Sequence, residues 1–185
     1  VKGLAVFKSE GQMVGEMNET ETAGLLWIRN WAEKHQLTVP CPIESAKASV
    51  DLDLMGSTSK TRVEIGEDGI PRFDIEVRTV FDVGEHFGNH MDMDQSWYID
   101  SLAKRANTTI AREIQAAVSK AKALNADVLG FAEEVHRQHP REWEVIRNNW
   151  PDIFPLVEVN VSSMSEITTR GMSAKNPDDS LKVVK

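Results

Sequence analysis

The sequence predicts an α+β fold in which helices pack on one face of a largely antiparallel sheet. Strict alternation of apolar and polar residues at 46–54 and at 73–77 is typical of strands with one buried face. Apolar residues recur every three or four positions over 97–124, which predicts one long amphipathic helix. Three consecutive predicted helices before a last strand favour helices gathered on one side of the sheet.

The first part of the chain predicts a hairpin followed by a helix. Short apolar stretches at 4–7 and 13–17 flank a polar, glycine-containing turn. Asn18 and Glu21 have the spacing of a capping box, in which each side chain accepts a hydrogen bond from the backbone of the other residue. We expect the helix to end before 39–42, whose two prolines cannot continue it.

Three strands are expected next, joined by short turns in an antiparallel meander. The first spans 46–54, and Gly-Ser-Thr-Ser at 56–59 is expected to turn the chain. The second lies around 63–65, and the Glu-Asp-Gly turn at 67–69 precedes the third strand at 73–77.

A polar loop and the long helix should follow. Residues 83–94 are rich in Gly, His and acidic residues and predict a loop. Asp94 is the expected N-cap of the helix at 97–124, with Ser96 as the competing choice. Asn125 can end the helix in a left-handed conformation.

The last part predicts two shorter helices and a strand. One helix is expected at 127–136, and Pro140 suits the first turn of another that ends before Trp150. Alternating valines predict a strand at 157–161, and the polar tail at 174–185 should fray.

Length and charge narrow the function classes. A chain of 185 residues fits one domain, which we place at 1–173. The formal net charge of -8 argues against a nucleic-acid partner, since phosphate binding needs clustered Lys and Arg. Because the apolar pattern closes one core, we expect the isolated domain to be a monomer.

The metal candidates are His86, His90, Asp92 and Asp94, which share the expected loop. Two His at four-residue spacing with nearby carboxylates could hold zinc or manganese. A solvated polar loop entering a helix is the favoured interpretation, because the segment offers no second-shell support. We therefore expect neither a metal nor another cofactor.

The catalytic candidates are equally weak. Glu133 and Glu134 are adjacent on a predicted helix and point about 100° apart, so they do not converge. Asp51 and Asp53 share the solvent face of a strand, where carboxylates favour solubility. Cys41 lies between two prolines without a predicted base. The sequence predicts a protein that is not an enzyme.

Several segments occur in an order and spacing that resemble one known family. They are Gly-Leu-Ala-Val-Phe-Lys at 3–8, Met-Val-Gly at 13–15, Glu-Thr-Ala-Gly-Leu-Leu-Trp at 21–27, Ala-Asp-Val-Leu-Gly-Phe at 126–131, and then Pro140, Trp143, Trp150, the strand at 157–161 and Gly171. This pattern is similar to the C-terminal domain of the C subunits of spore germinant receptors, the GerAC-like lipoproteins.

The resemblance implies a domain of a longer lipoprotein. A signal peptide, a lipobox cysteine and further N-terminal domains would lie upstream. The parent protein would be lipid-anchored at the outer face of the spore inner membrane, where it would work with the membrane-embedded A and B subunits in responding to nutrients. The family has no assigned enzymatic activity.

The favoured function is therefore a non-catalytic assembly module of a germinant receptor that triggers spore germination. The alternatives are a small-molecule sensing domain of the same receptor and an exported metallohydrolase. Within the resembling segments we expect Asp127 to cap a helix, Gly130 to permit close backbone approach and Phe131 to support the fold. The expected partner interface consists of Glu133, Arg137, Arg141, Trp143 and Trp150.

Overall fold

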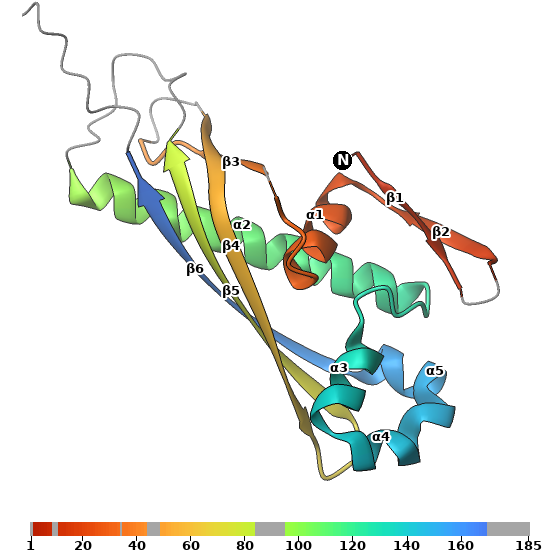
Figure 1. The fold of residues 1–185 in the computed structure, drawn as a ribbon. Coiled ribbons are helices and arrows are strands. Elements are labelled where there is room, and N and C mark those ends of the chain that lie inside the picture. The colour runs from red at the N-terminus through yellow and green to blue at the C-terminus, as the bar shows by residue number, and fades with distance from the viewer. Residues whose placement is uncertain (1, 9–10, 34, 44–48, 84–94, 170–185) are drawn as a thin grey trace, which may run out of the picture.

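The computed structural model describes residues 2–8, 11–33, 35–43, 49–83 and 95–169. It confirms an α+β fold with one sheet of four strands, ordered β3-β4-β5-β6, and a separate two-stranded hairpin (Figure 1). The long helix α2 runs behind the sheet, and the short helices gather at one end of it. Among the described residues, no helix is long and apolar enough to cross a membrane.

The predicted hairpin and first helix are present. Strands β1 (Leu4–Phe7) and β2 (Met13–Met17) pair antiparallel, and helix α1 spans Glu19–Ile28. The capping box is formed: the Glu21 N–H donates to Asn18 Oδ1 over 3.0 Å, and the Asn18 N–H donates to Glu21 Oε2 over 2.8 Å.

A strand that the sequence did not predict follows α1. Strand β3 (Gln36–Pro40) pairs antiparallel with the start of β4. Leu37 and Val39 alternate with exposed residues and are buried. The prolines at positions 40 and 42 indicated that a helix ends before them, but they did not indicate a strand. Two alternating apolar residues form too short a pattern to predict one.

The predicted turn at 56–59 is wrong. Strand β4 (Ser49–Ile65) continues through it for 17 residues, and the register shift between Leu54 and Gly56 is a bulge. Strand β5 (Pro71–Val83) pairs along this whole stretch, so cross-strand pairing overrides the turn tendency of Gly and Ser. The meander exists, but its three strands are β3, β4 and β5, and the turn at 67–69 is confirmed by Gly69 at φ 77°.

The last strand is longer than predicted. Strand β6 (Glu158–Thr168) pairs with β5 in parallel, which requires a long crossover connection. That connection contains α2 (Ser96–Ala123) and the short helices. The sheet thus remains largely antiparallel, with one parallel pair at its edge.

Helix α2 packs its apolar stripe along the inner face of the sheet. The buried side chains of this stripe are Tyr98, Leu102, Ala106, Ile110, Ile114, Ala117, Val118 and Ala121. Its N-cap is Gln95 and not Asp94 or Ser96, and the Gln95 side chain makes no capping hydrogen bond. Asn125 follows the helix in the predicted left-handed conformation, at φ 45°.

Helix α1 crosses α2 at very short range. A Cβ atom on Gly24 would lie 2.0 Å from the backbone oxygen of Glu113, so only glycine fits there. The indole N–H of Trp27 donates to Glu113 Oε2 over 2.8 Å and fixes the crossing. This contact places the end of α1 beside β4.

The short helices start later and are more numerous than predicted. Helix α3 spans Phe131–Gln138 instead of 127–136, and α4 (Pro140–Ile146) begins with the predicted proline. We expected the helical segment to end before Trp150. Instead a further short helix, α5 (Trp150–Ile153), follows and is flanked by 3-10 turns at Arg147–Asn149 and Phe154–Leu156. The rings of Phe131 and Phe73 stack with centroids 4.1 Å apart and attach α3 to the sheet.

Candidate partner-binding groove

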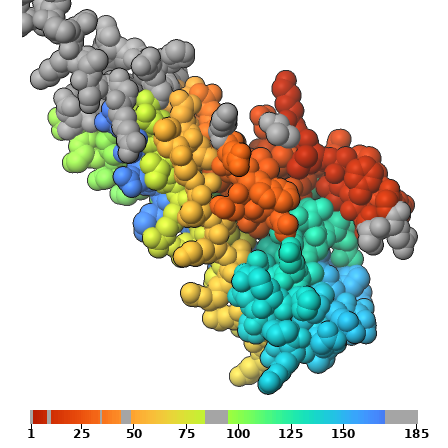
Figure 2. Space-filling view, viewed as in Figure 1, coloured from red at the N-terminus to blue at the C-terminus, as the bar shows by residue number. Residues whose placement is uncertain are grey.

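A surface groove with a volume of about 940 Å³ begins at the free part of β4 and extends across the neighbouring residues of β5 and β6. Strand β3 pairs only with residues 49–53 of β4, so the rest of β4 has no strand on that side among the described residues. Figure 2 shows α1, in orange, and α3, in teal, beside the gold strand β4. The end of α1 and one side of α3 form the walls of the groove.

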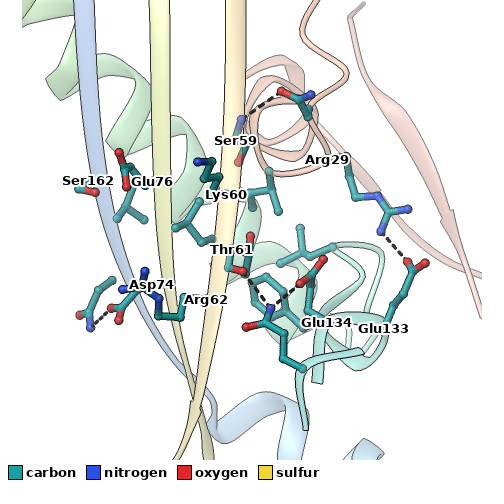
Figure 3. Close-up of a pocket in the computed structure, with 18 of the residues that line it drawn as sticks. Arg29, Ser59, Lys60, Thr61, Arg62, Asp74, Glu76, Glu133, Glu134 and Ser162 are labelled. Atoms are coloured by element: carbon teal, nitrogen blue, oxygen red, sulfur yellow. Dashed lines mark hydrogen bonds and ion pairs between the residues drawn. The ribbon is translucent and has the colours of Figure 1, made fainter. Parts of the chain in front are cut away.

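One side chain from α1's end binds the free edge of β4. Asn30 adopts a left-handed conformation at φ 56°, which ends the helix. Its Oδ1 atom accepts a hydrogen bond of 3.1 Å from the Ser59 N–H (Figure 3). A backbone donor of the edge strand is thereby satisfied without another strand.

The end of α3 binds the same edge farther along. Gln138 donates to the Thr61 carbonyl over 2.9 Å and accepts from the Val63 N–H over 3.0 Å. A ring nitrogen of His139 lies 2.8 Å from the Val63 carbonyl. These contacts imitate the ladder that a neighbouring strand would make, and they protect the edge against pairing.

Arg29 connects α1 to α3 across the groove. Its guanidinium lies 3.3 Å from Glu133 Oε2 and 4.9 Å from the ring centre of Trp31, which is 58% exposed. Gly130 has φ 81°, and a Cβ atom there would lie 1.9 Å from Arg29 Nη1. Gly130 thus provides both a left-handed turn and space for the arginine.

Asp127 holds the start of α3. Its carboxylate accepts hydrogen bonds from the N–H groups of Gly130, Phe131 and Ala132, at 3.0, 3.0 and 2.7 Å. It also accepts one from the indole N–H of Trp150 at 3.2 Å. One half-buried carboxylate therefore fixes both the first turn of α3 and the start of α5.

The lining of the groove is charged, with both signs represented. The charged lining residues are Arg29, Lys60, Arg62, Arg137, Asp74, Glu76, Glu133 and Glu134. Figure 3 labels all of these except Arg137. A hydrogen bond from Arg78 lowers the pKa of Glu76 below its usual value, and the charges of Arg78, Lys60 and Arg62 lower it further. Glu134 accepts from both Arg137 and Gln138. Side chains of this kind suit a polar, solvated contact.

The structure separates the predicted interface residues. Glu133 and Arg137 line the groove, with side chains 73% and 63% exposed. Arg141 is exposed on α4 outside the groove, and Trp143 is half-buried with its ring 5.4 Å from that of Trp150. Trp150 itself is buried, at 8% exposure, which removes it as a surface anchor because its indole serves the Asp127 network.

The sequence reasoning missed two residues that line the groove, Arg29 and Asn30, and also Trp31, whose ring lies against Arg29. The apolar stripe predicted a helix that extended to Ala32. On such a helix these three consecutive side chains would point in different directions and would not share a site. An Asn at the position after the last helical turn was the available signal.

The predicted metal candidates, His86, His90, Asp92 and Asp94, lie outside the described residues. Within the described ranges, no group of three or more His, Cys, Asp or Glu side chains could hold a metal ion.

The carboxylate pairs and the cysteine have structural neighbours. Asp51 accepts from the Thr38 hydroxyl over 2.6 Å, and Asp53 accepts from the Gln36 amide over 3.1 Å. Both contacts join β3 to β4. The buried Cys41 Sγ lies 3.7 Å from the Tyr98 hydroxyl.

The fold and the groove define a class: a four-stranded α+β domain with one long helix behind the sheet and a polar groove on a capped edge. The solved structure described as the GerBC protein has this fold, with a TM-score of 0.76 at 17% identity, covering 91% of this chain and 51% of that one. The model of the family "Spore germination B3/GerAC like, C-terminal" matches residues 2–171. The chain belongs to this family.

Curated relatives agree with this assignment. The chain is 27% identical over 184 residues to spore germination protein YndF of Bacillus subtilis (strain 168), covering 91% of this chain and 41% of the relative. It is 23% identical over 172 residues to spore germination protein KC of the same organism, covering 92% and 41%. The chain thus spans about two fifths of the length of these relatives.

Proposed function

We propose that this chain is a non-catalytic assembly module of a nutrient germinant receptor that triggers spore germination. The family description and the names of the relatives, all of which refer to spore germination, support this proposal. The parent protein would be a lipoprotein at the outer face of the spore inner membrane, anchored through an upstream cysteine and bound to the membrane-embedded A and B subunits.

The observation that carries the proposal is the groove on the capped edge of β4. Its open, charged lining differs from the enclosed and mostly apolar pockets that hold small molecules. This difference favours contact with another protein over direct nutrient sensing. Exposed Trp31, stacked on Arg29, supplies an aromatic and arginine pair of the kind that dominates binding energy at interfaces.

The proposed interface therefore comprises the groove and the adjoining exposed side of α3 and α4. From the residues predicted by sequence it retains Glu133, Arg137, Arg141 and Trp143, and it adds Trp31. Rim charges such as Glu133 and Arg137 would orient the partner, while Trp31 would contribute most of the affinity.

Co-purification of the full-length lipoprotein with the A and B subunits tests the proposal. Trp31→Ala should lower the recovery of both partners, since loss of an exposed aromatic anchor costs about 2 kcal/mol, or roughly thirtyfold in affinity. Glu133→Lys should weaken recovery less. Asp100→Lys, a charge reversal on the exposed start of α2, is the matched control and should have no effect.

Normal partner recovery and normal germination by folded Trp31→Ala and Glu133→Lys proteins would rule out the groove as the interface.

A further inference from the structure

The second edge of the sheet, strand β6, has no neighbouring strand among the described residues. The Gln115 side chain donates to the Val159 carbonyl over 3.2 Å, from a helix that does not belong to the sheet. The Val159 backbone therefore points away from β5. Because alternate residues of a parallel strand face the same side, the backbones of Val161, Ser163 and Ser165 also point away.

Side-chain burial shows that this edge is open. Phe73, Ile75, Val77 and Thr79 of β5 face α2 and are at most 3% exposed. Their direct neighbours on β6, Val159, Val161, Ser163 and Ser165, face the same side and are only half-buried. Helix α2 packs more closely on β6 than on β5, yet the β6 row is less buried, so solvent reaches that row from the edge.

Strand β6 lacks the features that usually protect an edge. It is 11 residues long, contains no Pro, Lys or Arg, and shows no register shift against β5. Natural edge strands are usually shortened, bulged, or interrupted by proline or inward-pointing charge. The free part of β4 is covered by side chains instead, so among the described residues one edge is closed and the other is left available.

We propose that the free edge of β6 binds an extended segment of another polypeptide, which adds a fifth strand to the sheet. Main-chain hydrogen bonds would supply affinity, and alternate side chains would supply specificity. This inference rests on the proposed function only in assigning the segment to a receptor partner.

Charge determines which segment fits. Glu158, which pairs with Arg72 over 3.1 Å, and Glu166 lie near the two ends of β6 and are exposed on its outer face, and the chain carries a net charge of -8. The two glutamates and the negative net charge favour Lys or Arg on the outer face of the incoming strand. Toward α2, the half-buried Val159 and Val161 favour apolar residues at alternate positions. A second copy of this chain fits less well, because it would bring together two acidic domains.

A synthetic peptide tests strand addition directly. The probe is Thr-Val-Lys-Val-Thr-Val-Thr-Val-Thr-Val-Lys, which matches the 11 residues of β6 in antiparallel orientation and places Lys opposite Glu158 and Glu166. It should bind the full chain and slow amide exchange at Val161, Ser163 and Ser165. The same peptide with both Lys replaced by Glu should bind about tenfold more weakly, because two ion pairs become two like-charge contacts.

Two substitutions at one position separate backbone pairing from side-chain loss. Ser163→Ala removes the hydroxyl bond to the Asn107 carbonyl but keeps the edge N–H, so peptide binding should persist within about twofold. Ser163→Pro removes that N–H as well, without breaking a bond to β5, and should abolish binding. Circular dichroism would verify that both variants are folded, and Glu166→Lys offers a second route because it should weaken binding of the Lys peptide.

Equal binding of the Lys peptide by the Ser163→Pro and Ser163→Ala chains would overturn the inference. So would the absence of binding to the unaltered chain, or protection of the same amides by self-association of the chain without peptide. The assembly role is measured separately, by partner recovery in Trp31→Ala. Failure of the peptide experiment with normal dependence on Trp31 would therefore refute strand addition alone.

Discussion

The two edges of the sheet differ in what covers them. Along β4, side chains from α1 and α3 bind the free backbone groups: Asn30 at Ser59, and Gln138 at Thr61 and Val63. Along β6, Gln115 reaches one carbonyl, and no further side-chain bond to an edge-facing backbone group of β6 occurs among the described residues. A binding partner can therefore contact the β4 edge only through side chains, whereas it can form hydrogen bonds with the backbone of the β6 edge.

The closed edge depends on segments that are distant in sequence. Asn30 reaches β4 because α1 is fixed on α2 through Gly24 and Trp27. Gln138 reaches it because Asp127 fixes the start of α3. Substitutions that loosen either support should therefore open the β4 edge and make the two edges more alike.

The largest effect is expected from Asp127→Ala. It leaves three backbone N–H groups and the Trp150 indole without their acceptor, so the free energy of unfolding should fall by about 3 kcal/mol. Chemical denaturation monitored by Trp fluorescence provides the measurement. Asp127→Asn keeps one acceptor oxygen and should lose less; equal losses in both variants would contradict the capping role.

Gly130→Ala should cost about 2 kcal/mol, because a residue with Cβ is strained at φ 81° and approaches Arg29. Thermal unfolding of the single variant and of the double variant with Arg29→Ala separates the two causes. The double variant should recover the part that comes from the clash. If removal of Arg29 restores nothing, the close approach does not contribute.

Gln138 and Gln115 each bind the backbone of one edge, so their substitution compares the stability that side-chain capping gives to β4 and to β6. Gln138→Ala should cost about 1.5 kcal/mol, since it leaves two half-buried backbone groups of β4 unpaired. Gln115→Ala should cost less than about 0.5 kcal/mol, because water can bind the exposed Val159 carbonyl. Similar losses in thermal unfolding would mean that the two edges are equally closed.

A smaller effect should appear in the pH dependence of stability. Burial raises the pKa of Glu113, although the hydrogen bond from Trp27 opposes the shift. The folded state then holds the proton more tightly than the unfolded state, so stability falls as the pH rises from the usual carboxyl pKa through the raised one. Glu113→Gln should remove this decline and leave the chain slightly more stable at neutral pH. A decline of the same size in Glu113→Gln would assign it to another group.

The sequence predicted the elements with strong local signals. The capping box at Asn18, the long helix, the turn at Gly69 and the helix starting at Pro140 all follow from side-chain chemistry within a few residues. Strand β3 and the uninterrupted β4 could not be predicted, because pairing with distant segments decides both.

The candidate site was predictable only in part, because some of its residues are brought together by contacts between segments that are distant in sequence. Glu133 and Arg137 belong to a segment that resembles a known family, and they line the groove. Asn30 reaches the groove through the α1–α2 crossing, and Trp31 lies beside it against Arg29. The indole of Trp150 is held by a carboxylate 23 residues away in sequence.

Residue-resolved amide exchange of the unliganded chain tests most directly whether one edge is closed and the other open. The Ser59 and Val63 N–H groups donate to side chains, while those of Val161 and Ser163 point away from β5 and have no partner among the described residues. We expect Ser59 and Val63 to exchange at least about tenfold more slowly than Val161 and Ser163 once intrinsic rates are removed. Equal protection of the two pairs would contradict the account.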